Sequence, residues 1–157
     1  MIDLIILSSF AIFGLLCAAN TKKTVLLAAF LAYMFVVLLV TLLFREPMPL
    51  SIELDPIASY RRAARAPTHL AIIEIRNIIL NVAMFVPLGI FLPLFFNKFR
   101  KLYLAAPIAA IASLAIETAQ FITRRGVFAI EDIIHNTLGA ALGFAFFLAF
   151  SKIFKKS

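Results

Sequence analysis

The chain has 157 residues, of which 64% are hydrophobic and 15% charged, and it carries a formal net charge of +7. Soluble domains average about 45–50% apolar and about 25% charged residues, so this composition excludes both an ordinary soluble domain and a disordered chain. The basic residues lie between apolar runs and form no stripe, so we expect no nucleic-acid partner. We therefore predict an integral membrane protein, whose single cysteine, Cys17, excludes a disulfide framework and a cysteine-based zinc site.

Five apolar runs approach the roughly 20 residues that a helix needs to cross a membrane. The runs are residues 4–19, 25–44, 78–96, 102–121 and 133–150. The first has Asp3 where a signal peptide would have a basic segment, so we interpret it as a retained span. We predict an all-α polytopic membrane helical bundle with about five transmembrane helices, in a single membrane domain over 1–157. Within it, residues 1–44 hold two generic spans, 45–77 an extracytoplasmic connection and 78–157 a three-helix core.

Lysines in the short loops set the predicted orientation of this bundle. They lie at residues 22–23, at 98–101 and at the end of the chain, which places all of them on one side of a five-span bundle. Because cytoplasmic loops carry an excess of basic residues, we predict that the N-terminus lies outside and the C-terminus in the cytoplasm. The basic residues of the opposite side are all arginines, and acidic residues are interleaved with them.

The long connection 45–77 is the only candidate for structure that does not span the membrane. Its prolines divide it into short pieces, and residues 57–66 carry three arginines at helical spacing: Arg61, Arg62 and Arg65. One interpretation is an amphipathic helix at the outer interface, where basic side chains meet anionic headgroups. The other is a solvated loop whose arginines pair with Glu53 and Asp55.

Polar residues within the third predicted span need partners, because polar groups are costly in a bilayer. Asn77 and Asn81 are four residues apart and share a helix face. Further along, Pro87 and Pro93 each remove a backbone donor and free a carbonyl about one turn earlier. We expect these carbonyls to find partners inside the protein or in a water-filled cavity, unless the prolines are simple packing kinks.

The fourth predicted span carries one polar stripe, formed by Ser113, Glu117, Gln120 and Arg124. Glu117 is the least expected residue of the chain, because it lies about a turn and a half inside the span. We expect Arg124, Arg125 or Arg76 to neutralise it. Intramembrane ionisable groups usually have a function, and the alternative is a carboxyl group that only holds helices together.

The fifth predicted span combines polar residues with small ones. Asp132 and Asn136 share a face with Gly139 and Gly143, and His135 lies beside them. The two glycines predict close approach of a neighbouring helix, and capping of the helix start is an alternative explanation for Asp132. His135 and Asn136 are further expected to bond to Asn81 or Gln120, if they have only a structural role.

These stripes predict one shared pocket in the outer half of the membrane. Its candidate ligand-binding residues are Asn77, Asn81, Glu117, Gln120, Arg124, Arg125, Asp132 and Asn136. Such a mixture of guanidinium, carboxyl and amide groups suits a phosphate or a sugar. The candidate catalytic residues are Glu117, Asp132 and His135, but they lack the spacing of known metal motifs. We expect no metal and no cofactor.

From Arg76 onward the sequence resembles the VanZ-like family of small bacterial membrane proteins. The matching stretches are Asn81-Val-Ala-Met-Phe-Val-Pro87-Leu-Gly89, Ser113-Leu-Ala-Ile-Glu117-Thr-Ala-Gln120, and Arg125 through Asp132 and Asn136-Thr-Leu-Gly139 to Gly143. The resemblance implies a multi-pass protein of the bacterial cytoplasmic membrane, and the founding member of the family is associated with resistance to the glycopeptide teicoplanin. Ala129 departs from the family pattern, in which an acidic residue is frequent, so no acidic cluster is carried over to that position.

Three functions are compatible with these features. The one we favour is binding of a membrane lipid or lipid-linked envelope precursor at the outer leaflet, with an effect on glycopeptide susceptibility as an expectation from the resemblance. The second is an intramembrane enzyme that acts on a lipid headgroup, with Glu117 or Asp132 as acid–base group and His135 assisting. The third is a non-catalytic helix-packing subunit of an envelope complex or of a helix–helix oligomer.

Overall fold

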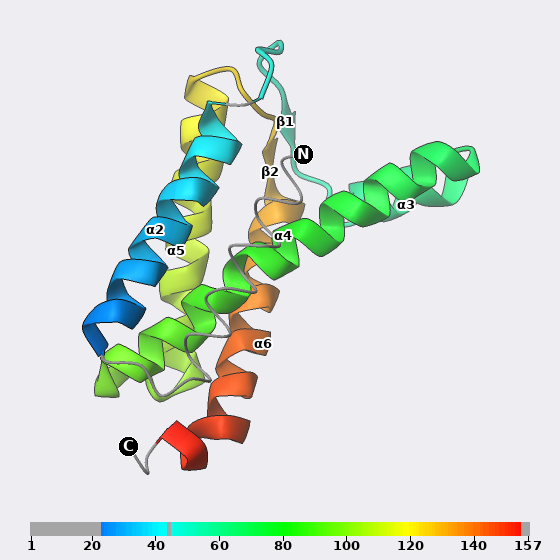
Figure 1. Cartoon of the computed structure of the whole chain (residues 1–157). Helices are drawn as coiled ribbons and strands as arrows, with labels where there is room; N and C mark the ends of the chain where they lie inside the picture. Colours follow the sequence, from blue (N-terminus) through cyan, green and yellow to red (C-terminus); the bar gives the residue numbers. More distant parts are fainter. Residues whose placement is uncertain (1–22, 44, 155–157) are drawn as a thin grey trace.

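The structure is a computed structural model that describes residues 23–43 and 45–154, with side chains described as far as Ser151. Helices make up most of this part of the chain, and two short strands lie in its connections (Figure 1). In chain order the elements are α2 (Lys23–Leu42), β1 (Ile52–Glu53), α3 (Ala58–Arg65), α4 (Thr68–Phe95), the 3₁₀ helix η1 (Asn97–Phe99), α5 (Leu102–Ile122), β2 (Phe128–Ala129) and α6 (Ile130–Phe154).

The predicted all-α membrane bundle is confirmed. Within the described residues, four helices are long and apolar enough to cross a membrane, namely α2, α4, α5 and residues Ile130–Ser151 of α6. The predicted span at residues 4–19 lies outside the described residues, and so does Cys17. The orientation of the bundle stays a prediction.

The apolar run of the third span begins at residue 78, but Thr68 after Pro67 also predicts a helix that starts near His69 as a turn outside the membrane. Helix α4 begins at Thr68 and runs for 28 residues, so it starts where this second signal predicts. Its first turns pack against α3, where Arg62 bonds to Glu74, and this contact stabilises helix that hydropathy alone assigns to a connection. The fifth span likewise begins at Ile130 instead of residue 133, so Glu131 and Asp132 lie in the first turn of α6. Acidic side chains are favourable at that end of a helix dipole.

Helices α4 and α6 are in contact at the level of their backbones, as the small residues of the fifth span predict. A Cβ atom on Gly139 would overlap the carbonyl oxygen of Val82, and one on Gly143 would overlap that of Val86. Gly89 of α4 makes the reciprocal approach to the carbonyl of Ala140. Only glycine permits such contacts, and they hold the two helices together without a layer of side chains between them.

Helix α2 closes the other side of the bundle and supplies a partner for the proline-containing helix α4. Pro87 has no N–H to donate to the carbonyl of Ala83, and in the same turn the hydroxyl of Tyr33 donates to the carbonyl of Met84 at 3.0 Å. One turn along α2, the ring of Phe30 stacks on Phe91 with 3.7 Å between ring centroids. A protein side chain thus bonds to the backbone beside this proline, while the expected partner for the Ala83 carbonyl itself stays a prediction.

The connection between α2 and α4 is folded. Its strand β1 pairs in parallel with β2, with Ile52 opposite Phe128 and Glu53 opposite Ala129. After β1 the chain forms α3, which lies alongside the first turns of α4 and projects with them from the bundle (Figure 1). Both interpretations of residues 57–66 hold in part, because the segment is helical and two of its arginines still pair with Asp55 and Glu53.

Candidate functional site

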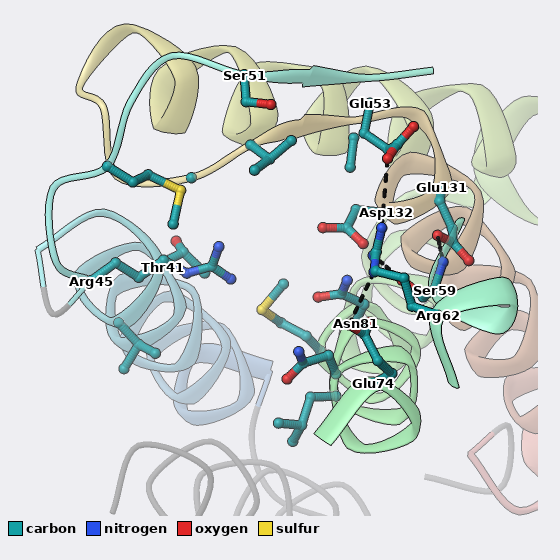
Figure 2. Close-up of a pocket in the computed structure, with 18 residues that line it drawn as sticks. Thr41, Arg45, Ser51, Glu53, Ser59, Arg62, Glu74, Asn81, Glu131 and Asp132 are labelled. Atoms are coloured by element: carbon teal, nitrogen blue, oxygen red, sulfur yellow. Dashed lines mark hydrogen bonds and ion pairs between the residues drawn. The ribbon is translucent and has the colours of Figure 1, made fainter. Parts of the chain in front are cut away.

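A polar cavity of about 490 Å³ lies between the end of α2, the middle of α4, the start of α6 and the strand pair β1–β2. Residues 45–67, which precede α4, contribute about half of its polar lining, and α4 and α6 contribute most of the rest (Figure 2). The polar lining residues are Thr41, Arg45, Ser51, Glu53, Ser59, Arg62, Glu74, Asn77, Asn81, Glu131 and Asp132.

One wall of the cavity unites polar residues that the sequence predicted to meet. Asn77 and Asn81 of α4 line it together with Asp132 of α6, and the side chain of Asn81 lies close enough to the carboxyl group of Asp132 to interact with it. Arg45, on the opposite side of the cavity in Figure 2, interacts electrostatically with Asp132. The close α4–α6 packing below this wall sets the positions of the two asparagines relative to Asp132.

Arg62 organises a second wall, which the sequence did not predict. Its Nε donates to Glu74 at 3.0 Å, its Nη2 donates to the hydroxyl of Ser59 at 2.9 Å, and its Nη1 lies 3.5 Å from a carboxyl oxygen of Glu53. The hydrogen bond to Glu74 raises the pKa of the Arg62 guanidinium above its usual value, so this residue keeps its charge. A planar guanidinium suits this role, because it can bond to several partners in fixed directions.

Glu131 connects α6 to α3 and is almost fully buried, with 2% of its surface exposed. One carboxyl oxygen accepts a hydrogen bond of 2.8 Å from the backbone N–H of Ser59, at the start of α3. The other oxygen has no hydrogen-bond partner among the described residues. Glu131 therefore positions α3 and still has an acceptor that is not used.

Glu117 lies behind the cavity and does not line it. It is 3% exposed, and its Oε2 accepts a hydrogen bond of 3.1 Å from the backbone N–H of Ala129 in β2. We expected Arg124, Arg125 or Arg76 to neutralise Glu117, and among the described residues Arg45 interacts with it electrostatically. The reason is the path of the connection after α2, which folds back towards α5 and brings Arg45 close, whereas Arg125 bonds elsewhere.

Arg124 and Arg125 shape the turn after α5, and neither of them lines the cavity. Arg124 has a positive φ of 57°, and hydrogen bonds from its N–H to Phe121 and from Arg125 to Gln120 complete a Schellman motif. The guanidinium of Arg125 donates to the carbonyls of Leu43 and Arg45, at 2.7 and 2.8 Å. These arginines join the α5–β2 turn to the end of α2.

Gln120 supports the same junction, since its amide lies 3.4 Å from the carbonyl of Thr41 in α2. It is 2% exposed and does not line the cavity. The amide thus holds α5 against the last turn of α2, next to the turn that the two arginines shape.

His135 and Asn136 have other partners than those expected. His135 Nε2 lies 2.9 Å from the hydroxyl of Tyr60 in α3, and the amide of Asn136 donates to Ser113 of α5 at 2.8 Å. The predicted bonds to Asn81 or Gln120 are therefore wrong, because α3, which hydropathy did not reveal, covers this face of α6 and Ser113 lies nearer. Neither residue lines the cavity.

The predicted polar residues thus divide into two groups. Asn77, Asn81 and Asp132 line the cavity, whereas Glu117, Gln120, Arg124, Arg125, His135 and Asn136 bond to the elements around it. Lining residues that the sequence analysis missed come largely from the connection 45–77, whose interleaved arginines and acidic residues were a signal for them.

The chemistry of the cavity is that of a binding site for polar groups. Four carboxyl groups, two guanidinium groups and two amides line it, so it can accept and donate hydrogen bonds. In the described part of the chain, no group of three or more His, Cys, Asp and Glu residues could hold a metal ion.

Comparisons with known proteins place the chain in a family. Neither a curated protein nor a solved structure matched it. The sequence model described as VanZ/LLP1 matches residues 25–151, which include the four candidate membrane helices almost completely and every lining residue of the cavity. With four fifths of its length matched, this membrane protein belongs to the VanZ/LLP1 family.

Proposed function

We propose that the polar cavity binds the headgroup of a membrane lipid or of a lipid-linked cell-envelope component. The observation that supports this proposal is the meeting of Asn77, Asn81 and Asp132 on one wall of a cavity of about 490 Å³. Ligand sites typically measure about 300–1,000 Å³. The cavity lies at the end of α2 and the start of α6, and the ends of membrane helices are the level at which a lipid presents its headgroup.

The lining chemistry favours a headgroup rich in hydrogen-bond donors. Carboxyl groups outnumber guanidinium groups in the cavity, and Arg62 already bonds to Glu74 and Ser59. A bare phosphate offers only acceptors and would meet these carboxyl groups unfavourably. Hydroxyl groups of a sugar or an ammonium group would instead donate to the carboxyl group of Asp132.

The cellular setting that we propose is the outer leaflet of a bacterial cytoplasmic membrane. The predicted orientation, with lysine-rich loops in the cytoplasm, would put the cavity on the exterior side. Membership of the VanZ/LLP1 family supports a link to the cell envelope. Altered susceptibility to glycopeptide antibiotics is then the expected phenotype when binding is lost.

Lipid mass spectrometry of the purified protein tests the proposal. The wild type and the Asp132→Asn and Asn81→Leu variants are purified in mild detergent and their retained lipids compared, with Glu46→Gln as a matched control. Glu46 is exposed and lies outside the cavity, so this control removes one carboxylate without touching the site. We expect the wild type and the control to retain a lipid with a hydroxyl-rich or amine-bearing headgroup, and the two cavity variants to lose it.

The same variants carry the test into cells. Asp132→Asn cells should show a changed profile of envelope lipids and a changed glycopeptide susceptibility, while Glu46→Gln cells should match the wild type. If the cavity variants keep the full lipid complement of the wild type at unchanged thermal stability, the cavity does not bind a headgroup.

A further inference from the structure

A second recess lies on the α3–α4 projection and adjoins the polar cavity, with which it shares the lining residues Arg62 and Glu74. It is an open groove of about 450 Å³ lined by Arg61, Arg62, Arg65, Leu70, Ile73 and Glu74. Its walls are the arginine-bearing face of α3 and the first turns of α4, which lie side by side in Figure 1. The groove therefore combines a basic rim with an apolar floor.

The basic rim is provided by α3, a helix of eight residues with three arginines and no acidic residue. Arg61 pairs with Asp55, and Arg62 bonds to Glu74 and Glu53. Arg65 is exposed, and its side chain makes no hydrogen bond or ion pair within the described residues. The guanidinium of Arg65 is thus available to an anion from outside the chain.

The apolar floor belongs to α4. Leu70 and Ile73 lie one turn apart on the same helix face, with 45% and 43% of their surfaces exposed. They lie beside guanidinium groups, whereas lipid-facing residues deep in a membrane have apolar neighbours. An apolar strip next to a cationic rim matches the boundary between acyl chains and headgroups.

The length of α4 places the groove at that boundary. Its 28 residues extend over about 42 Å, whereas the hydrocarbon core is about 30 Å thick. The charged residues of the first turns, Glu74 and Arg76, together with the arginines of α3, are costly inside hydrocarbon. The excess length therefore falls at this end, and the α3–α4 projection lies in the interface.

We propose that the α3–α4 groove binds an anionic phospholipid, with the phosphate at Arg65 and an acyl chain along Leu70 and Ile73. Charge complementarity selects this occupant, because a guanidinium group forms paired hydrogen bonds with phosphate oxygens. The only carboxyl group of the groove, that of Glu74, is already bonded to Arg62 and repels the phosphate less for that reason. This inference does not depend on what the polar cavity binds.

Fluorescence quenching by brominated lipids tests this proposal directly. The chain has no tryptophan, so Leu70→Trp places a single reporter in the groove. The variant is reconstituted into vesicles that contain phosphatidylglycerol or phosphatidylcholine with brominated acyl chains, at equal bromine content. We expect phosphatidylglycerol to quench more strongly, with about fivefold tighter apparent binding for each arginine that reaches the phosphate.

Two controls separate selective binding from general lipid contact. Arg65→Gln in the reporter background should reduce the preference for phosphatidylglycerol, whereas Lys98→Gln, which removes a charge at the opposite end of α4, should leave it unchanged. Leu142→Trp on the exposed side of α6 should be quenched equally by both lipids. Ile73→Trp provides a second reporter in case Leu70→Trp does not fold.

Three results would overturn the proposal. Equal quenching of the groove reporter by both lipids would show contact without selection of an anionic headgroup. A preference that survives Arg65→Gln would place the phosphate elsewhere, and no quenching by either lipid would show that acyl chains do not reach the groove.

Discussion

Glu117 of α5 accepts a hydrogen bond of 3.1 Å from the backbone N–H of Ala129 in β2. Ala129 lines the polar cavity, and Glu117 lies behind it. The most unexpected charged residue of the sequence thus supports the strand that borders the cavity. Its position also explains why an acidic residue deep in a span need not touch a ligand to matter for the site.

Replacement of Glu117 should therefore affect stability before it affects binding. Glu117→Leu removes the acceptor of the Ala129 N–H, and we expect it to lower the free energy of unfolding by about 1–3 kcal/mol. Glu117→Gln keeps an acceptor oxygen and should cost clearly less. Thermal unfolding of the purified variants in detergent measures both effects. Equal stability of Glu117→Leu and the wild type would contradict the assigned role.

The turn after α5 offers a stabilising substitution. Arg124 occupies the left-handed region at φ 57°. Every residue except glycine is disfavoured in this region, by roughly 1–2 kcal/mol. Arg124→Gly should relieve this cost and raise the midpoint of thermal unfolding, whereas Arg124→Ala should not. A lower midpoint for Arg124→Gly than for Arg124→Ala would contradict the backbone cost at this position, whereas midpoints of both variants below that of the wild type would mean that the Arg124 side chain makes stabilising contacts.

Added volume between α4 and α6 should be poorly tolerated. Gly139→Ala puts a methyl group onto the backbone carbonyl of Val82, which cannot move aside as a flexible side chain can. We expect a loss of about 1–3 kcal/mol or more, visible as a lower yield of monodisperse protein. Gly126→Ala is the comparison, because its nearest neighbour would be a side-chain atom of Gln120 at 3.1 Å. Similar yields of the two variants would contradict the close packing.

The multiple bonds of Arg62 predict that lysine cannot replace it. Arg62→Lys retains the charge but cannot bond to Glu74, Ser59 and Glu53 at once. Hydrogen exchange followed by mass spectrometry should show faster exchange of the amides of α3 and of the segment around β1. Arg65→Lys, at a position without such bonds, should exchange like the wild type. Unchanged exchange in Arg62→Lys would show that α3 is held by its other contacts.

The membrane bundle was predictable from the sequence because hydropathy reports directly on the cost of placing a segment in hydrocarbon. Hydropathy gave the helices α2, α5 and α6 to within a few residues. It missed the first turns of α4, because Glu74, Arg76 and Asn77 lower the hydropathy of a segment that packing against α3 keeps helical. The close approach at Gly139 and Gly143 was predictable from spacing alone, since small residues on one helix face have few other uses.

The site was less predictable, because helical spacing shows which residues share a face and not which neighbour that face meets. Asp132 and Asn81 do meet, whereas His135, on an adjacent face of α6, meets Tyr60 of α3. The role of Arg45 depends on a chain reversal and a parallel strand pair that no local pattern signals. Pairing between strands so distant in sequence is decided by the tertiary fold.

The backbone contact between α4 and α6 has a consequence for selectivity. Helices that touch at Gly89, Gly139 and Gly143 cannot slide or rotate past each other without a clash. The cavity wall formed by Asn77, Asn81 and Asp132 is consequently preorganised. The distances between these side chains are set before a ligand binds, so no conformational entropy is lost there on binding. This rigid wall then determines which ligands of similar shape are bound. Adjustment to the size of a ligand requires movement of the opposing segment, Arg45–Glu53.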